Sequence, residues 1–591
     1  MTLPAPASPA PPNTAPAPAA VCDILVIGSG AGALATAVTA AHAGLSVIVV
    51  EKAPVLGGTT AWSGGWLWIP RNPLARAAGI DEDPAEPRRY LASEIGNAAG
   101  DPRVEVFLQN GPEMVQFFED NTEVAFIDGN RVPDFHATPG AARGGRSVAA
   151  KPYDGRRLGP WIDRLRPPLD VISVAGMGIA SGADLAHFVN ATRAPASALH
   201  VAGRFLRHGR DLARHRRGLQ LVNGNALAAR LLRSALDLGV EIRVDAPAET
   251  LLRADGRVTG ARLGGPVPGE ILARRGVVLG TGGFPHDRAR IAATFDHARE
   301  GGTHHSAAPR ENTGDGMRMA EAVGAEVATD LVHPGAWAPV SLVPRKDGTV
   351  ARFPHLIERA KPGFLAVDAT GRRFVNEADS YHDFMAALFR ATPAGQEPAA
   401  WLIADHPAQR RWGLGWAKPF PFPLRGPLAS GYLKRGRTLA ELAAACGLDP
   451  ATLEATVARF NDHARRGADP DFGRGASDYN RVQGDAAATG PNPALGPLER
   501  GPFYAVRIVA GSLGTFAGLR TDAAARVLDG AGAPIPGLFA VGNDMSSIFA
   551  GNYPSGGITL GPAMTFGYIA GRTLAGLPVT GLGEPEPAPT T

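Results

Sequence analysis

The chain has 591 residues, of which 45% are hydrophobic and 19% are charged, and its formal net charge is only +3. One hydrophobic core rarely serves so long a chain, so at least two domains are expected. The small charge provides no basic stripe for nucleic acid. Two cysteines, Cys22 and Cys446, argue against a disulfide scaffold and a cysteine-rich metal site. A reducing, cytoplasmic location is therefore predicted.

Residues 1–20 are mostly alanine and proline, which predicts an extended tail. The segment lacks a basic start followed by an apolar run, so it is not a secretory signal. No uncharged apolar run of about 18 residues occurs, and no membrane-spanning helix is predicted. Order is expected from Cys22, with a strand at 23–27, an alanine-rich helix at 31–43 and a strand at 45–50. This succession predicts a right-handed βαβ unit.

The turn between the first strand and the helix has the form G-x-G-x-x-A. Gly28 allows the tight turn, Gly30 lets a pyrophosphate approach the backbone, and Ala33 keeps helix and strand close. With Ala31 and Gly32, these residues place free N–H groups at the helix N-terminus, where an anion binds. Glu51, about 20 residues further on, is placed to accept hydrogen bonds from a ribose. Together these features predict a dinucleotide site.

A second glycine-rich stretch follows directly after the ribose acid. It contains Lys52, Gly58, Thr59, Thr60, Ser63, Gly64 and Gly65. The stretch resembles the succinate dehydrogenase and fumarate reductase flavoprotein superfamily, in which this segment runs along FAD. Members with covalent flavin carry a histidine here. None lies between Glu51 and Pro70, so the resemblance implies non-covalent FAD.

The middle of the chain continues the α/β pattern. We expect a helix at 225–238, a strand at 241–244, a β-ribbon around 255–256, a strand at 276–279 and a helix at 312–324. Before them, residues 200–217 carry six arginines among apolar residues. This segment is either a solvated helix face or a peripheral membrane or lid element.

Residues 328–504 differ in character and contain a predicted helical hairpin at 438–464. We interpret them as a substrate-capping domain inserted into a Rossmann-like FAD-binding domain, which comprises 21–327 and 505–580. Residues 581–591 form a second tail. The strand pattern returns at 537–542, and a last helix is expected at 559–574. The predicted fold class is therefore α/β with an α+β cap.

Two further segments resemble flavin contacts of the superfamily. The first contains Thr281, Gly282 and Gly283. The second contains Gly542, Asn543 and Asp544, and then Gly557, Ile558 and Thr559 at the start of the last helix. The N-terminus of that helix would face the electron-rich end of the flavin. No separate NAD fingerprint is found.

The two arginines typical of fumarate reductases are absent. After the R-F-x-N-E motif at 373–377, the position of the proton-transferring arginine holds Tyr381. In the stretch 549–557, the position of the carboxylate-gripping arginine holds Tyr553. A bidentate arginine clamp recognises a carboxylate, and two phenols do not replace it. Fumarate and succinate are therefore predicted not to bind.

The two tyrosines resemble the 3-ketosteroid dehydrogenase branch of the superfamily. The resemblance implies that Tyr553 and the N–H of Gly557 donate hydrogen bonds to a substrate ketone. Tyr381 would take the proton alpha to that ketone, and a hydride from the beta carbon would pass to the flavin. An alpha C–H is a very weak acid, so two donors on the carbonyl oxygen are physically necessary to stabilise the developing enolate.

Two positions depart from the branch. Phe135 stands where members of the branch have a tyrosine that assists the base. Either His136 or solvent would then provide this assistance, or the substrate differs. Ser555 resembles the Δ4-(5α) enzymes more than the Δ1 enzymes, and it could instead cap the last helix. Trp337 and His333 either line the pocket or belong to the core. His304 and His305 form a loop pair, and no metal site is predicted.

The predicted function is FAD-dependent introduction of a double bond next to the ketone of a cyclic substrate, with 3-ketosteroids favoured. A cyclohexanone-type dehydrogenase, an ene-reductase running in reverse and a flavin-binding scaffold are the alternatives. An external quinone-like or dye-like acceptor is expected rather than NAD(P). The expected partners are a small apolar ketone and no nucleic acid. Peripheral membrane association is left open.

Overall fold

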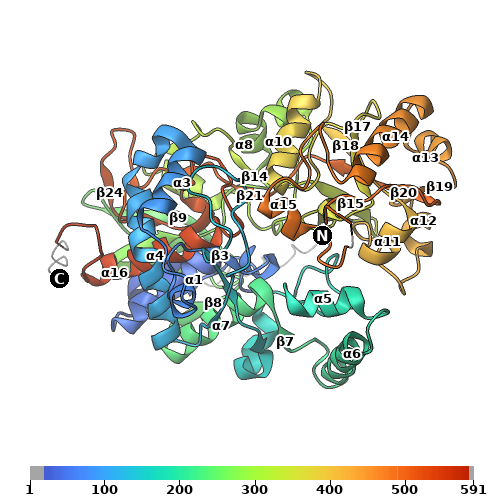
Figure 1. Cartoon of the computed structure of the whole chain (residues 1–591). Coiled ribbons are helices and arrows are strands. Elements are labelled where there is room, and N and C mark those ends of the chain that lie inside the picture. The colour runs from blue at the N-terminus through green and yellow to red at the C-terminus, as the bar shows by residue number, and fades with distance from the viewer. Residues whose placement is uncertain (1–18, 489, 585–591) are drawn as a thin grey trace, which may run out of the picture.

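The computed structural model describes residues 19–488 and 490–584. Its larger sheet has eight strands, in the order β23-β24-β11-β1-β2-β8, with β9 and β10 paired alongside β11. Figure 1 shows this sheet with its helices on the left and a second sheet on the right. The strands of the larger sheet are β1 Ala20–Ile27, β2 Val47–Val50, β8 Glu241–Arg243, β9 Ala248–Ala254, β10 Arg257–Leu263, β11 Gly269–Leu279, β23 Arg526–Leu528 and β24 Pro534–Ala540.

The centre of the larger sheet is parallel, as the predicted βαβ unit requires. Strand β1 pairs in parallel with both β2 and β11, and β24 pairs in parallel with β11. The predicted β-ribbon is the antiparallel pair β9–β10. Because β11 carries its carboxyl end beside those of β1 and β24, the loops that follow these three strands meet at one edge.

Helix α1 (Ala31–His42) packs on this sheet between α7 (Asn223–Asp237) and α16 (Leu560–Ala575). The contact with α16 is close because small residues face each other. A Cβ on Gly567 would lie 2.5 Å from the carbonyl oxygen of Gly32, and a Cβ on Gly571 would lie 2.7 Å from the Cβ of Thr39. The glycines of α16 are thus needed for this packing against α1.

The second sheet is antiparallel, in the order β16-β15-β20-β18-β17 with β19 beside β20. One face is covered by the predicted helical hairpin, α13 (Leu439–Cys446) and α14 (Pro450–Arg466), through an apolar core that includes Leu365, Ile403 and Phe460. Helix α10 (Tyr381–Ala391) packs on this sheet as well. Its strands are β15 Val340–Pro344, β16 Val350–Pro354, β17 Phe364–Asp368, β18 Ala399–Ala404, β19 Lys434–Gly436 and β20 Phe503–Val509.

The fold class is confirmed as α/β, whereas the domain limits stay a prediction. The predicted limit at 504/505 falls inside β20, a strand of the second sheet. Residues 1–18 of the predicted tail 1–20 lie outside the described part of the chain. Strand β1 already begins at Ala20. Of the tail 581–591, residues 585–591 lie outside the described part.

Several predicted elements differ in length from those observed. The strand expected at 276–279 is the end of the longer β11. The helix expected at 312–324 is only α9 (Asp315–Glu321), because Gly314 has a positive φ of 75° at its N-cap. The Nδ2 of Asn312 donates to Thr59 Oγ1 at 3.1 Å and to the carbonyl oxygen of Gly282 at 3.1 Å. Residues 312–314 therefore form a loop that packs against the glycine-rich segments instead of the first turn of the helix.

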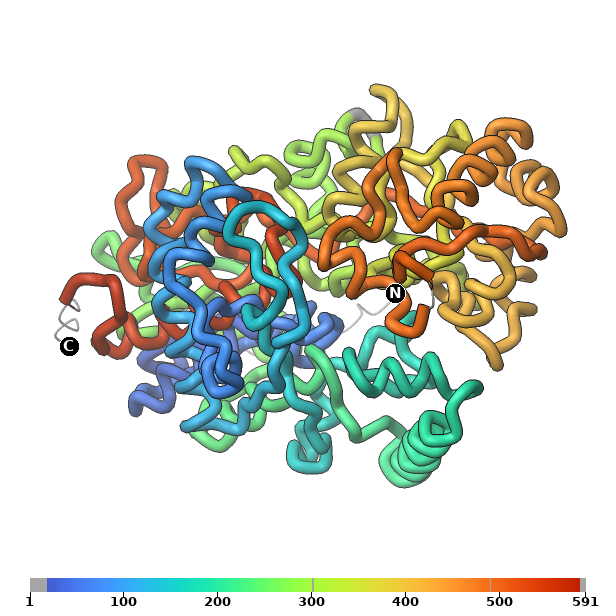
Figure 2. The backbone as a smooth tube through the Cα atoms, in the orientation of Figure 1, coloured from blue at the N-terminus to red at the C-terminus, as the bar shows by residue number. Residues whose placement is uncertain are grey.

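A helical pair extends beyond the two sheets. Helices α5 (Ala183–Asn190) and α6 (Pro195–His215) lie below the second sheet in Figures 1 and 2. Among the residues that the structure describes, no helix combines the length and apolarity needed to cross a bilayer.

Candidate active site

A single cleft of about 1500 Å³ runs from the loop edge of the larger sheet to the second sheet and to α5 and α6. This exceeds the volume of an ordinary small-ligand pocket, so a cofactor and a substrate can share it. Most of the predicted cofactor residues line the cleft: Gly28, Gly30, Ala31, Gly32, Ala33, Glu51, Lys52, Gly58, Thr59, Thr60, Ser63, Gly64, Gly65, Thr281, Gly282, Gly542, Asn543, Gly557 and Thr559.

The glycine turn has the shape that a dinucleotide requires. Gly28 has a φ of 109°, and a Cβ there would lie 2.2 Å from the carbonyl oxygen of Gly280. At Gly30, apart from its chain neighbours, the one atom of the described residues within 4 Å of a Cβ position is Thr60 Oγ1, at 3.8 Å, so the turn is open toward the cleft. Ala31 N–H donates to Thr60 Oγ1 at 3.0 Å. A pyrophosphate can therefore approach the backbone at Gly30, whereas the prediction of a free N–H at Ala31 is wrong, because Thr60 already accepts from it.

The carboxylate of Glu51 is fixed by hydrogen bonds at the end of β2. Its carboxylate accepts hydrogen bonds from Ser29 Oγ at 2.6 Å and from Ala53 N–H at 2.9 Å. Burial raises the pKa of Glu51, although these hydrogen bonds and nearby cations oppose the shift. Ser29 is a variable position of the G-x-G-x-x-A motif, and no role was predicted for it. Its hydroxyl group orients the carboxylate that is predicted to bind a ribose.

Three predicted cofactor residues lie behind the cleft wall: Gly283, Asp544 and Ile558. Asp544 is fully buried and accepts from the N–H groups of Thr281 at 2.5 Å and Gly283 at 2.9 Å. It fixes the two loops that follow β11 and β24 against each other. The residues present therefore fit FAD, since most of the predicted residues line the cleft and these three lie behind its wall.

The two predicted catalytic phenols meet in the cleft. Tyr381 Oη donates to Tyr553 Oη at 2.7 Å, although the residues are 172 positions apart. Burial raises the pKa of Tyr553 to about 12, and burial with the neighbouring Tyr553 raises the pKa of Tyr381 well above its usual value. Both phenols are therefore protonated near neutral pH in the ligand-free protein.

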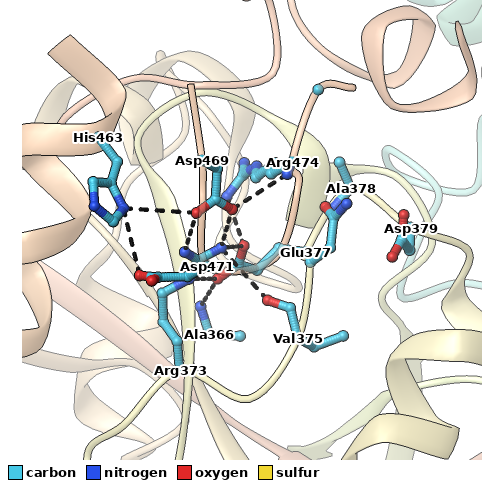
Figure 3. Close-up of polar contacts among 12 residues, drawn as sticks. Ala366, Arg373, Val375, Glu377, Ala378, Asp379, His463, Asp469, Asp471 and Arg474 are labelled. Carbon is cyan, nitrogen blue, oxygen red and sulfur yellow. Dashed lines mark hydrogen bonds and ion pairs between the residues drawn. The ribbon is translucent and has the colours of Figure 1, made fainter. Parts of the chain in front are cut away.

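Tyr381 is positioned by the R-F-x-N-E motif that precedes it. It is the first residue of α10, and the Ser380 side chain caps this helix by accepting from Asp383 N–H at 3.1 Å. Glu377 is fully buried and accepts from Arg373 Nη2 at 2.8 Å and Arg474 Nη1 at 3.1 Å. Figure 3 shows Glu377 turned into this ion network, with Asp379 lying apart from it.

The same network accounts for a group of possible metal ligands, His463, Asp469 and Asp471, in the described part of the chain. Asp469 pairs with Arg373 at 3.0 Å, and Asp471 accepts from Arg459 Nε at 2.8 Å (Figure 3 shows the His463 and Arg373 contacts). Since both carboxylates are already neutralised by guanidinium groups, we assign these residues to structure.

Tyr553 and Gly557 belong to the segment that leads into α16. Gly557 has a φ of 101°, and a Cβ there would lie 2.7 Å from Trp68 N. Its carbonyl oxygen accepts from Trp68 N–H at 3.1 Å. In the described part of the chain its own N–H has no acceptor. The N–H of Gly557 is thus available to a ligand in the cleft.

The predicted substrate residues divide into one that lines the cleft and three that do not. Phe135 lines it, and its ring lies 5.7 Å from Tyr381, 5.7 Å from Tyr553 and 4.6 Å from Tyr479 between centroids. Tyr479 is buried beside them and also lines the cleft. Sequence reasoning missed Tyr479, because no motif marks it.

His136, Ser555 and Trp337 stand outside the cleft lining. His136 bridges Glu94 and Asp383, with its Nε2 2.8 Å from Asp383 Oδ2. Ser555 is buried, and it does not cap α16, whose N-cap is Thr559.

Trp337 and His304 belong to an aromatic cluster. The ring of Trp337 packs at 4.7 Å from Phe295 and 5.4 Å from Phe389. His304 contacts His297 and Ser512, at 3.0 Å and 2.8 Å. The other predicted loop histidine, His305, lies in strand β12 (His305–Ser306). These positions follow from packing, which local sequence does not reveal.

The parallel sheet, the glycine turn, the ribose acid and the cleft together define an FAD-dependent oxidoreductase. A sequence profile of the FAD binding domain family matches residues 23–560. The chain therefore belongs to this family, and within it to the 3-ketosteroid dehydrogenase branch of the fumarate reductase and succinate dehydrogenase flavoproteins.

Three similar proteins can be compared over nearly their whole length. A 4-oxocyclohex-2-ene-1-carboxylate 5-dehydrogenase of Sinomonas cyclohexanicum is 41% identical, covering 96% of this chain and 97% of the relative. A 4-oxocyclohexanecarboxylate 2-dehydrogenase of the same organism is 39% identical, with coverage of 94% and 93%. The crystal structure of 3-ketosteroid delta1-dehydrogenase from Sterolibacterium denitrificans, solved with 1,4-androstadiene-3,17-dione, has 34% identity and a TM-score of 0.86, covering 94% and 99%.

Proposed function

We propose that this enzyme dehydrogenates a cyclic ketone, introducing a double bond between the carbons alpha and beta to the carbonyl. The observation that carries the proposal is the pair of phenols, Tyr381 and Tyr553, with their hydroxyl oxygens 2.7 Å apart in the cleft that the cofactor residues line. A scaffold without turnover would have no use for two desolvated hydroxyl groups facing each other.

Each residue has one task in this proposal. Tyr553 Oη and the N–H of Gly557 donate to the ketone oxygen and stabilise the negative charge that develops there. When a ketone replaces Tyr381 as the hydrogen-bond partner of Tyr553, Tyr381 takes the proton from the alpha carbon. Bound FAD supplies the hydride acceptor for the beta carbon.

The group that binds at the phenol pair is a ketone rather than a carboxylate of a dicarboxylate. Tyrosines occupy both positions at which a fumarate reductase would carry an arginine, and Phe135 adds a third aromatic ring without charge. A carbonyl oxygen needs hydrogen-bond donors and no cation. Fumarate and succinate should therefore neither bind nor react.

Two substrate classes are supported about equally. The two Sinomonas relatives act, by their names, on six-membered ring ketones that carry a carboxylate, and the Sterolibacterium enzyme acts on a 3-ketosteroid. The cleft volume admits a steroid beside the cofactor. Phe135 lacks the hydroxyl group that the branch carries next to the base. The test must therefore also distinguish positions of the new double bond.

The test is anaerobic bleaching of the flavin by a panel of 4-androstene-3,17-dione, a 5α-reduced 3-ketosteroid, 4-oxocyclohexanecarboxylate and succinate. At least one ketone should bleach the wild-type enzyme, and succinate should not. Tyr381→Phe should lower the rate by about 10²–10⁴, the usual worth of a general base, while ligand-induced flavin perturbation persists. Near-normal turnover of Tyr381→Phe would remove this residue from the role of base.

We further propose that FAD is held non-covalently and that the electrons pass to an external quinone-like or dye-like acceptor. The segment beside the ribose acid, 51–70, contains no histidine for attachment, and the chain has one dinucleotide fingerprint. Reduction of NAD+ by the ketone-reduced enzyme would contradict the second part.

Helix α6 supports a peripheral membrane role. Leu199 and Leu206 are each 76% exposed on it, and Arg207 and Arg210 are exposed on the same helix. Exposed leucines beside arginines suit the interface of an anionic bilayer. We expect the enzyme to float with vesicles of phosphatidylserine and phosphatidylcholine at low salt, and Leu199→Glu/Leu206→Glu to abolish flotation. Absence of wild-type flotation would refute this role.

A further inference from the structure

The cleft carries an excess of positive charge on one wall. Several cations that line it have a carboxylate partner of their own, namely Lys52 with Asp315, Arg166 with Glu311 and Arg204 with Asp184. Lys361 differs, because among the residues that the structure describes its Nζ donates to two main-chain carbonyl oxygens alone, those of Gln483 at 2.5 Å and Gly484 at 2.7 Å. Carbonyl oxygens solvate an ammonium group but do not neutralise it.

Lys361 shares its surroundings with a second cation. Lys361 Nζ lies 5.0 Å from the centroid of the Trp412 ring, and the Arg411 guanidinium carbon lies 4.6 Å from the same ring. Asp485 pairs with Arg411 Nη2 at 2.7 Å, and all four side chains line the cleft. Two cations thus face one carboxylate.

The remaining charges near this cluster do not cancel the excess. Glu358 lies close enough to act on Lys361, but it is paired with the buried His355 at 2.6 Å. Arg193 adds positive potential at Arg411. The Nε of Arg411 is buried and has no partner in the described part of the chain. Burial lowers the pKa of Lys361 to about 8, as expected where a cation lacks a full counter-charge.

Helix α15 (Asp478–Gln483) relates the cluster to the phenol pair. Tyr479, in its first turn, packs 4.6 Å from Phe135, whose ring stacks on Tyr553. Gln483, whose carbonyl holds Lys361, lies four residues further along, a rise of about 6 Å. The cations therefore lie at the far end of the helix whose first turn packs against Phe135 and, through it, Tyr553, at a place suited to a substituent rather than to the ketone.

We propose that Lys361 and Arg411 form an anion subsite that binds a carboxylate of the substrate, distal to the ketone that Tyr553 engages. The proposal rests on the proposed function and narrows its substrate to the anionic class. A ring ketone with a carboxyl group and a 3-ketosteroid with an acidic side chain share this chemistry. A neutral steroid would leave the two cations with Asp485 as their one carboxylate partner in the cluster, so one positive charge would stay uncompensated.

The test compares acids with their methyl esters in stopped-flow flavin bleaching by the FAD-loaded full-length enzyme. One pair is 4-oxocyclohexanecarboxylate and its ester, and the other is 3-oxochol-4-en-24-oate and its ester. For one pair, kcat/KM should favour the acid by about 10–100-fold, the worth of a charge-assisted hydrogen bond. The pair that shows the preference identifies the source of the carboxylate.

Variants assign the preference to the two cations. Lys361→Met and Arg411→Met should each lower kcat/KM for the acid by about 10-fold or more, through KM, and leave the ester unchanged. Lys361→Arg should keep the preference. Arg410→Met is the matched control, because Arg410 is the neighbour of Arg411 on the same helix, packs on Phe420 and does not line the cleft.

Equal rates for acid and ester in the wild-type enzyme would overturn the subsite and leave the proposed function standing, and this comparison needs no variant to fold. Equal losses for acid and ester in both variants would also overturn it. Failure of every ketone to bleach the flavin would instead overturn the proposed function.

Discussion

Tyr553 is buried, Tyr381 is half-buried, and their hydroxyl groups hydrogen-bond to each other. Desolvation disfavours a phenolate at both, so the pKa of Tyr553 rises to about 12 and that of Tyr381 rises further above its usual value. The base is therefore almost fully protonated at neutral pH, and only its small deprotonated fraction can accept a proton.

This protonation state predicts a pH dependence of flavin reduction by a bound ketone. The deprotonated fraction of Tyr381 grows about tenfold per pH unit below its pKa. The logarithm of the rate should therefore rise with a slope near +1 between pH 6 and pH 9, without a plateau. Stopped-flow reduction checks this, and Tyr381→Phe should lose the slope. A plateau below pH 8 would show that the base has a pKa lowered from the ordinary tyrosine value of about 10.

At the scale of elements, the loop between β17 and α10 is held by ion pairs in the protein interior. Glu377 accepts hydrogen bonds from Arg373, from Arg474 and from Ala366 N–H, the last at 3.0 Å. Burial alone would raise the pKa of Glu377, but the two guanidinium groups lower it below its usual value. The loop thus delivers Tyr381 to the cleft on a rigid support.

Breaking this support should be costly. Glu377→Gln removes the carboxylate that Arg373 and Arg474 share and leaves Asp469, the partner of Arg373, facing two buried guanidinium groups. Breaking a buried ion pair costs about 3–5 kcal/mol. Glu397→Gln is the matched control, because Glu397 pairs with Arg507 in an exposed ion pair worth about 0–1 kcal/mol. Urea unfolding of both FAD-loaded variants measures the difference. Equal destabilisation would show that the buried network does not hold the fold.

At the scale of the whole molecule, the cleft joins the two sheets. Its wall includes the turns after β1, β11 and β24 from the larger sheet and Tyr381, Phe353 and Lys361 from the region of the second sheet. A cofactor that fills part of this cleft contacts residues far apart in the chain. Binding should therefore stabilise the folded molecule as a whole.

Reversible binding of FAD should be visible in thermal unfolding. At a free FAD concentration of 100 times Kd, the stabilisation is about 2.7 kcal/mol, so the apparent Tm should rise with added FAD. Glu51→Gln should bind FAD more weakly and need more of it for the same shift. Flavin should appear in the supernatant after acid precipitation. Flavin that stays with the pellet would contradict non-covalent binding.

The sequence by itself determined those parts of the protein whose structure depends on residues adjacent in the chain. The predicted βαβ unit and the geometry of its glycine turn are confirmed because turn geometry and strand periodicity are encoded in adjacent residues, whereas the ribose-binding role of Glu51 stays a prediction. The helical hairpin at 439–466 is confirmed for the same reason. The pairing of Tyr381 with Tyr553 was suggested by two separate motifs, and the structure brings the two hydroxyl groups together.

Only the tertiary structure decided which side chains face the cleft. His136 follows Phe135 directly, yet it turns toward Glu94 and Asp383 while Phe135 faces the phenols. Tyr479 and Lys361 reach the cleft from segments that carry no motif. Burial and charge compensation depend on neighbours hundreds of residues away, so a single sequence does not specify them.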